Sequence, residues 1–132
     1  MQLFDEEWIA AANEALAGLP EVPGVDAVIE YTISGRPIGR VSLTATLVDG
    51  VFSGIALGRS DRSNSEGADI AISMNYPDAV AILSGESTSD AGYMSGAVKV
   101  EGDYPLWLLG LRPVRVAAIG ALAAVMAQTS SE

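Results

Sequence analysis

Residues 68–111, ADIAISMNYPDAVAILSGESTSDAGYMSGAVKVEGDYPLWLLGL, decide the fold expected of this chain. They open with strict alternation of apolar and polar residues, which is typical of a strand with one buried face. Pro77 then suits the first turn of a helix that Gly85 ends. A second alternating strand contains Val98 and Val100, and helical spacing resumes after it. This order predicts half of a sheet with apolar helices on one face and almost no reactive side chain among them.

The upstream residues supply the other half of that sheet. Asp5 suits the N-cap of a helix that Gly18 ends, and two alternating strands follow. Asp49 and Gly50 predict a tight hairpin, because both central residues of a type I′ turn need positive φ. The expected strands are residues 28–33, 41–47, 51–57, 68–75 and 98–101, and the expected helices are residues 5–18, 77–85, 87–95, 104–111 and 114–127.

Composition limits the chemistry that this chain can perform. At 132 residues it is expected to form a single domain, residues 1–132, around one hydrophobic core. The net charge of -10 repels nucleic acid. The chain has no cysteine and no histidine, so it lacks thiol chemistry, the usual general base and the commonest metal ligands. We therefore expect no catalysis, no metal and no cofactor.

The two ends of the sequence bear on location and on partners. The first residues, MQLFDEEWIAAANEA, carry acids where an export signal needs bases, so a cytoplasmic protein is expected. The apolar residues 114–127 are too few to span a bilayer, which takes about 20 residues as a helix. A helix apolar all round must be covered all round, so its outer side is expected to face a ligand, a dimer mate or, transiently, a membrane.

Four arginines are candidates for binding a lipid headgroup, because guanidinium binds carboxylate and phosphate bidentately. Arg112 and Arg115 flank the start of the 114–127 helix. Arg59 and Arg62 lie in the polar loop GRSDRSNSEG. The alternative for each is an ordinary solvated surface charge.

The segment SMNYPDAVAILSGES, followed by GYMSGAVKVEGDYPLWLLGL, resembles the sterol carrier protein type 2 family over about 45 residues. In that family a strand bearing Asp leads through a helix ending in Gly to a short helix, and then through an alternating strand and Gly-Asp or Gly-Asn to an apolar helix. Gly92 departs from the pattern, since the family more often has Ala there. The matching positions are Asp69, Gly85, Gly96, Val98, Val100, Gly102 and Asp103.

The resemblance implies an α/β (α+β) fold, with a five-stranded, mainly antiparallel sheet covered on one face by helices and enclosing an apolar tunnel. It implies a non-catalytic domain that binds or transfers a small-molecule lipid such as a fatty acyl chain or a sterol. The residues expected to line the tunnel are Tyr31, Leu43, Leu47, Ile70, Ile72, Met74, Leu83, Met94, Val98, Val100, Leu108, Leu111, Ile119, Leu122 and Met126.

Two alternatives stay open at this point. One is a structural homodimer, joined through the alanine-rich 114–127 helix, whose tunnel is filled by its own side chains. The other is a cofactor-free enzyme, or an accessory domain that recruits hydrophobic substrates for a separate enzyme. The sequence leaves the identity of any ligand undecided.

Overall fold

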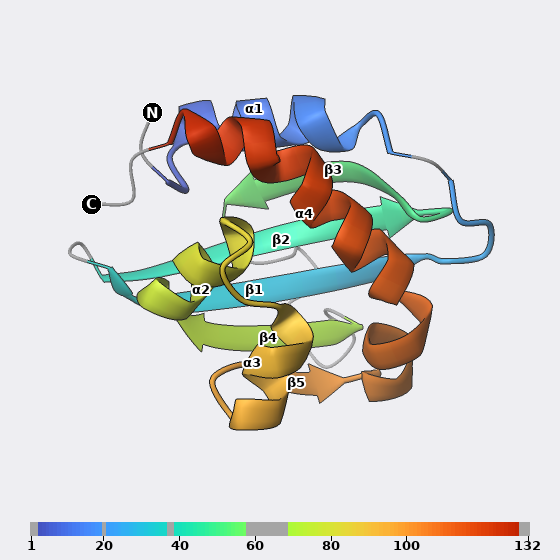
Figure 1. The fold of residues 1–132 in the computed structure, drawn as a ribbon. Helices are drawn as coiled ribbons and strands as arrows, with labels where there is room; N and C mark the ends of the chain where they lie inside the picture. Colours follow the sequence, from blue (N-terminus) through green and yellow to red (C-terminus); the bar gives the residue numbers. More distant parts are fainter. Residues whose placement is uncertain (1–2, 20, 37–38, 58–68, 130–132) are drawn as a thin grey trace.

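A five-stranded sheet forms one layer, and the helices described in the computed structural model lie together over one of its faces (Figure 1). The structure describes residues 3–19, 21–36, 39–57 and 69–129. The helices are α1 (Glu6–Leu16), α2 (Tyr76–Leu83), α3 (Ser89–Ser95), the π-helix η1 (Leu106–Gly110) and α4 (Arg112–Ala127). The strands are β1 (Ala27–Arg36), β2 (Gly39–Val48), β3 (Val51–Leu57), β4 (Ile70–Asn75) and β5 (Lys99–Gly102).

The sheet has the strand order β3-β2-β1-β4-β5, and it is mixed but mostly antiparallel. Only β1 and β4 pair in parallel among these neighbours, with Tyr31 opposite Ile72. The predicted hairpin between β2 and β3 is confirmed, since Asp49 has φ 51° and Gly50 has φ 76°. The two-faced strands therefore place one apolar row of each strand under the helices.

The helix starts follow from local capping. The Asp5 side chain accepts a hydrogen bond of 2.7 Å from the Trp8 amide and caps α1 as predicted. Asn75 caps α2 in the same way through the Asp78 amide, and Pro77 lies in the first turn. The expected helix over residues 104–111 is a π-helix instead of an α-helix, because the Leu111 amide bonds the Leu106 carbonyl five residues back.

The core divides into two clusters beneath the helices. The first joins Trp8 and Leu16 of α1 to Leu122 of α4. The second contains Trp107 of η1 and Ile70 of β4. No helix within the described ranges is long and apolar enough to cross a membrane.

Small residues of α4 face the core alongside bulky ones, since Ala118 is buried while Val116 is 68% exposed. The buried stripe follows the spacing of Val114, Ala118 and Leu122, four residues apart, because these positions share one side of a helix. Small Ala118 therefore lies at the helix–core contact.

Candidate functional site

An apolar cavity of about 140 Å³ lies between the inner face of the sheet and the helices. Strands β1, β2, β3 and β4 supply its floor, and α1, α2 and α4 supply most of its walls and roof. The residues that line it are Phe4, Trp8, Leu16, Tyr31, Ile33, Leu43, Ala45, Phe52, Ile55, Ile72, Met74, Ala79, Ile82, Leu83, Ser89, Val98, Trp107, Arg115, Ala118, Ile119 and Leu122.

Part of the predicted tunnel lining borders this cavity. These residues come from the floor strands, from α2, from the approach to β5 and from α4: they are Tyr31, Leu43, Ile72, Met74, Leu83, Val98, Ile119 and Leu122. The remaining predicted residues do not border it: Leu47, Ile70, Met94, Val100, Leu108, Leu111 and Met126.

Trp107 explains most of that division. Its large side chain is 1% exposed, borders the cavity, and belongs to the same core cluster as Leu47, Ile70 and Leu111, which lie outside the cavity. Met94 is a separate case, because it is 84% exposed on α3. Strand alternation identifies the inner face of the sheet, but it does not identify which residues of that face border a cavity.

Sequence reasoning missed the contribution of α1 to the cavity. Trp8 and Leu16 line it from this helix, while Phe4 lies just before the helix and packs edge-on against Trp8 at 5.2 Å between ring centroids. The apolar helical spacing of α1 was the available signal. It indicates a buried face, and it does not distinguish a cavity wall from ordinary core.

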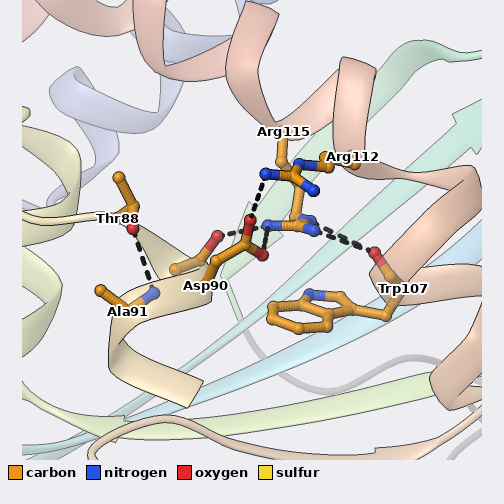
Figure 2. Close-up of polar contacts among 7 residues, drawn as sticks. Thr88, Asp90, Ala91, Trp107, Arg112 and Arg115 are labelled. Atoms are coloured by element: carbon orange, nitrogen blue, oxygen red, sulfur yellow. Dashed lines mark hydrogen bonds and ion pairs between the residues drawn. The ribbon is translucent and has the colours of Figure 1, made fainter. Parts of the chain in front are cut away.

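The polar exception in the cavity lining is at the α3–α4 end, where Arg115 and Ser89 meet. Only 14% of the Arg115 side chain is exposed, and its Nη1 donates hydrogen bonds to Ser89 Oγ at 2.6 Å and Asp90 Oδ1 at 3.0 Å. The guanidinium also lies over the Trp107 ring, with Cζ 4.1 Å from the ring centroid. Figure 2 shows Arg115 held between α3 and the η1 segment.

The π-helix η1 supplies part of the set of contacts that hold Arg115. In an α-helix the Leu111 amide would bond the Trp107 carbonyl, but here it bonds Leu106 at 2.8 Å. The Trp107 carbonyl instead accepts from Nε and Nη2 of Arg115, at 3.3 and 3.2 Å (Figure 2). Widening of this turn therefore frees the oxygen that holds Arg115.

Asp90 is shared between two arginines. Besides its bond to Arg115, its Oδ2 lies 3.4 Å from Nη2 of Arg112, whose side chain is 63% exposed. Thr88 caps α3 by accepting from the Ala91 amide at 3.0 Å, which fixes the turn that carries Asp90 (Figure 2). The cluster of Arg112, Arg115 and Asp90 thus has two positive charges and one negative charge. Arg59 and Arg62 lie outside the described residues.

The aromatic residues add polar hydrogen atoms to an otherwise apolar site. Burial raises the pKa of Tyr31 to about 12, and the charge of Arg115 acts in the opposite direction, so the hydroxyl is a neutral donor near pH 7. The buried indole nitrogens of Trp8 and Trp107 have no hydrogen-bond partner within the described part of the chain. In that same part, no group of three or more acidic residues could hold a metal ion.

Solved structures share this architecture. Sterol carrier protein 2 matches with a TM-score of 0.72 and 16% identity, over 92% of this chain and 98% of the other. The chain has the fold of sterol carrier protein 2. A conserved hypothetical protein from Thermus thermophilus matches with a TM-score of 0.65 and 16% identity, over 95% and 90% of the two chains.

A third similar structure is that of a palmitated protein. Palmitated sterol carrier protein 2 like 2 from Aedes aegypti matches with a TM-score of 0.58 and 17% identity, over 85% of this chain and 88% of the other. No protein-family model and no curated protein matches the sequence. Because the sequence identities are only 16–17%, the similarity to these solved structures shows a shared fold.

Proposed function

We propose that this protein binds a lipid-like molecule with an acyl chain or similar apolar body in the cavity under α4, and that it acts as a carrier without catalysing a reaction. The observation that carries the proposal is the cavity itself, a void with an almost wholly apolar lining in a fold shared with sterol carrier protein 2. The similar Aedes aegypti protein, described as palmitated, supports a fatty acyl ligand.

Apolar burial supplies the driving force in this proposal. Moving a chain of about fourteen methylenes out of water gains on the order of 11 kcal/mol gross, before the costs of ordering and association are subtracted. Polar contacts therefore need to contribute little beyond orientation. Two lining residues suit ligands of varied shape: Ala118 has a small side chain, and Met74 has a flexible thioether.

The cavity must widen to accept such a chain. Its volume of about 140 Å³ is close to that of an engineered cavity that holds benzene, about 150 Å³, whereas ligand pockets usually measure about 300 Å³ or more. We propose that α4 moves away from α1, because Ala118 and Leu122 form the cavity roof next to this contact. Binding should then rigidify the pair of helices.

Both tryptophans of the chain border the cavity and report on its contents. Hexadecanoate brominated in mid-chain should quench their fluorescence saturably, because bromine quenches only at short range. Unbrominated hexadecanoate is the matched control, and it should displace the brominated ligand without quenching. Native mass spectrometry of freshly purified protein should show bound lipid that solvent extraction removes.

Absence of both quenching and co-purified lipid would count against the carrier proposal. Substrate turnover in a screen of hydrophobic esters would favour the enzyme alternative. The homodimer through α4, transient membrane contact and a cytoplasmic location remain predictions, to be measured by analytical ultracentrifugation, vesicle co-sedimentation and cell fractionation.

A further inference from the structure

The cluster of Arg112, Arg115 and Asp90 points to the chemical class of the ligand headgroup. Two guanidinium groups share one carboxylate, so the cluster keeps one uncompensated positive charge in a protein of net charge -10. Arg115, the buried member, lines the apolar cavity. A positive charge at the end of an apolar cavity suits an amphipathic ligand that has one negative charge.

We infer that Asp90 occupies the position of a ligand carboxylate, and that an anionic headgroup displaces it from Arg115 while Arg112 retains it. This inference rests on the proposed function and specifies its headgroup. The exchange is feasible because the exposed Arg112 already lies 3.4 Å from Asp90, whose side chain is 32% exposed. Asp90 therefore stays paired and hydrated when it leaves Arg115.

Arg115 is held for this exchange by groups that the ligand does not need. The Trp107 carbonyl accepts from Nε and Nη2, and the Trp107 ring lies under the guanidinium. The bonds from Nη1 to Ser89 and Asp90 are the ones that face α3. A carboxylate that replaces Asp90 there keeps Arg115 fully paired, which avoids leaving a buried charge without a partner.

Neighbouring hydrogen-bond donors favour an acceptor at the same place. The Trp107 indole nitrogen is buried and unpaired within the described residues, and Figure 2 shows its ring beneath Arg115. Tyr31 lines the same cavity with a neutral hydroxyl near pH 7. A ligand carboxylate offers oxygen acceptors to this set of donors, whereas an alkyl group offers none.

Matched ligands test the inference. Wild-type protein should bind dodecanoate about tenfold more tightly than dodecan-1-ol, because only the acid pairs with Arg115. Arg115→Met keeps the apolar stem over Trp107 and should remove this preference, so that the acid and the alcohol then bind with similar affinity. Asp90→Asn removes the internal competitor and should tighten dodecanoate binding several-fold, with little change for the alcohol.

Bromine position tests the orientation of the chain. Trp8 and Trp107 belong to different core clusters. In Trp8→Phe protein, 2-bromododecanoate should quench Trp107 more strongly than 12-bromododecanoate does. In Trp107→Phe protein, 12-bromododecanoate should quench Trp8 more strongly than 2-bromododecanoate does, because the methyl end of the ligand lies near Trp8.

The outcomes separate this inference from the proposed function. Equal binding of acid and alcohol by wild type, unchanged by Arg115→Met and Asp90→Asn, overturns the headgroup assignment and leaves lipid binding intact. Weaker binding of both ligands to Asp90→Asn overturns the exchange and assigns Asp90 a purely structural role. Failure of wild type to bind either ligand refutes the proposed function itself.

Discussion

A close contact with Val98 holds α3 beside the segment that leads into β5. Gly92 lies in the middle of α3 and is buried, and its carbonyl accepts from the Val98 amide at 3.0 Å. A Cβ at Gly92 would lie 2.6 Å from Cγ2 of Val98. The side chain of Val98 is stiff, since it is branched at Cβ, and it is itself 2% exposed. Position 92 is therefore glycine because close packing requires it.

Gly92→Ala should lower the free energy of unfolding by about 1 kcal/mol, because overpacking costs about 1–3 kcal/mol and outweighs the helix propensity gained. Gly120→Ala in α4 is the matched control, since nothing lies within 4 Å of its Cβ position. The control should be neutral or more stable by up to about 1 kcal/mol in urea unfolding.

A double-mutant cycle tests the named clash. The Gly92→Ala and Val98→Ala changes together should cost about 1 kcal/mol less than the sum of their separate costs. Additive costs would show that the methyl group introduced by Gly92→Ala does not meet Val98.

Tyr31 makes stability sensitive to alkaline pH. Its pKa is raised from 10.0 to about 12, so the folded state holds this proton more tightly than the unfolded state does. The stabilisation is complete below pH 10 and is lost as the pH rises to about 12, by an amount on the order of 2 kcal/mol. Tyr31→Phe should lose less stability than wild type over that interval in urea unfolding.

The comparison isolates this one residue. Tyr104, whose pKa is also raised, chiefly by its hydrogen bond with Tyr93, is present in both proteins. Parallel loss of stability in wild type and Tyr31→Phe would mean that Tyr31 is not the group responsible.

At the scale of elements, α1 protects the exposed edge of the sheet. Strand β3 is at one end of the strand order, and an unpaired edge invites pairing with another chain. Asn13 of α1 satisfies both backbone groups of Ile55: its Nδ2 donates to the carbonyl at 3.0 Å, and its Oδ1 accepts from the amide at 2.6 Å. The side-chain amide therefore takes the place of a neighbouring strand.

Asn13→Ala should lower the free energy of unfolding by about 1–3 kcal/mol, because it leaves two part-buried backbone groups without partners. Hydrogen exchange at the Ile55 amide should accelerate more than exchange at amides of β1. Glu14→Ala, on the exposed side of the same helix, is the control and should change stability by less than about 0.5 kcal/mol. Equal effects of the two variants would refute the edge-capping role of Asn13.

The elements also show which features sequence can predict. The hairpin at Asp49 and Gly50 was predictable because its determinant is local positive φ. The contacts that hold Arg115 were not predictable. They depend on the Leu111 amide bonding a carbonyl one residue further back, which frees the Trp107 carbonyl. No side-chain pattern encodes that shift directly. The sequence therefore predicted the strands and helices well and the polar end of the cavity only as one of several arginine hypotheses.

Across the whole molecule, the sheet has one inner face that two helical groups cover unevenly. Trp107 and its core cluster are buried at the η1 end, and smaller residues such as Ala79 and Ala118 line the incompletely filled cavity. Alternation along each strand correctly identified the inner face of the sheet. The position of the cavity on that face depends on how segments distant in the sequence pack together. The cavity is therefore a property of the assembled layers.

An unfilled cavity lowers stability, so filling it should separate stability from ligand binding. Side chains that border an incompletely filled space lose packing contacts on that side, and this lowers stability. Ala118→Leu places a larger apolar side chain in the cavity roof, and it should raise the free energy of unfolding by about 1 kcal/mol and weaken dodecanoate binding at least tenfold. Ala123→Leu, on the exposed side of α4, should change neither quantity appreciably. Full ligand affinity in a stabilised Ala118→Leu protein would place the ligand elsewhere. A joint gain of stability and loss of binding would show that the cavity serves ligand binding and lowers the stability of the ligand-free protein.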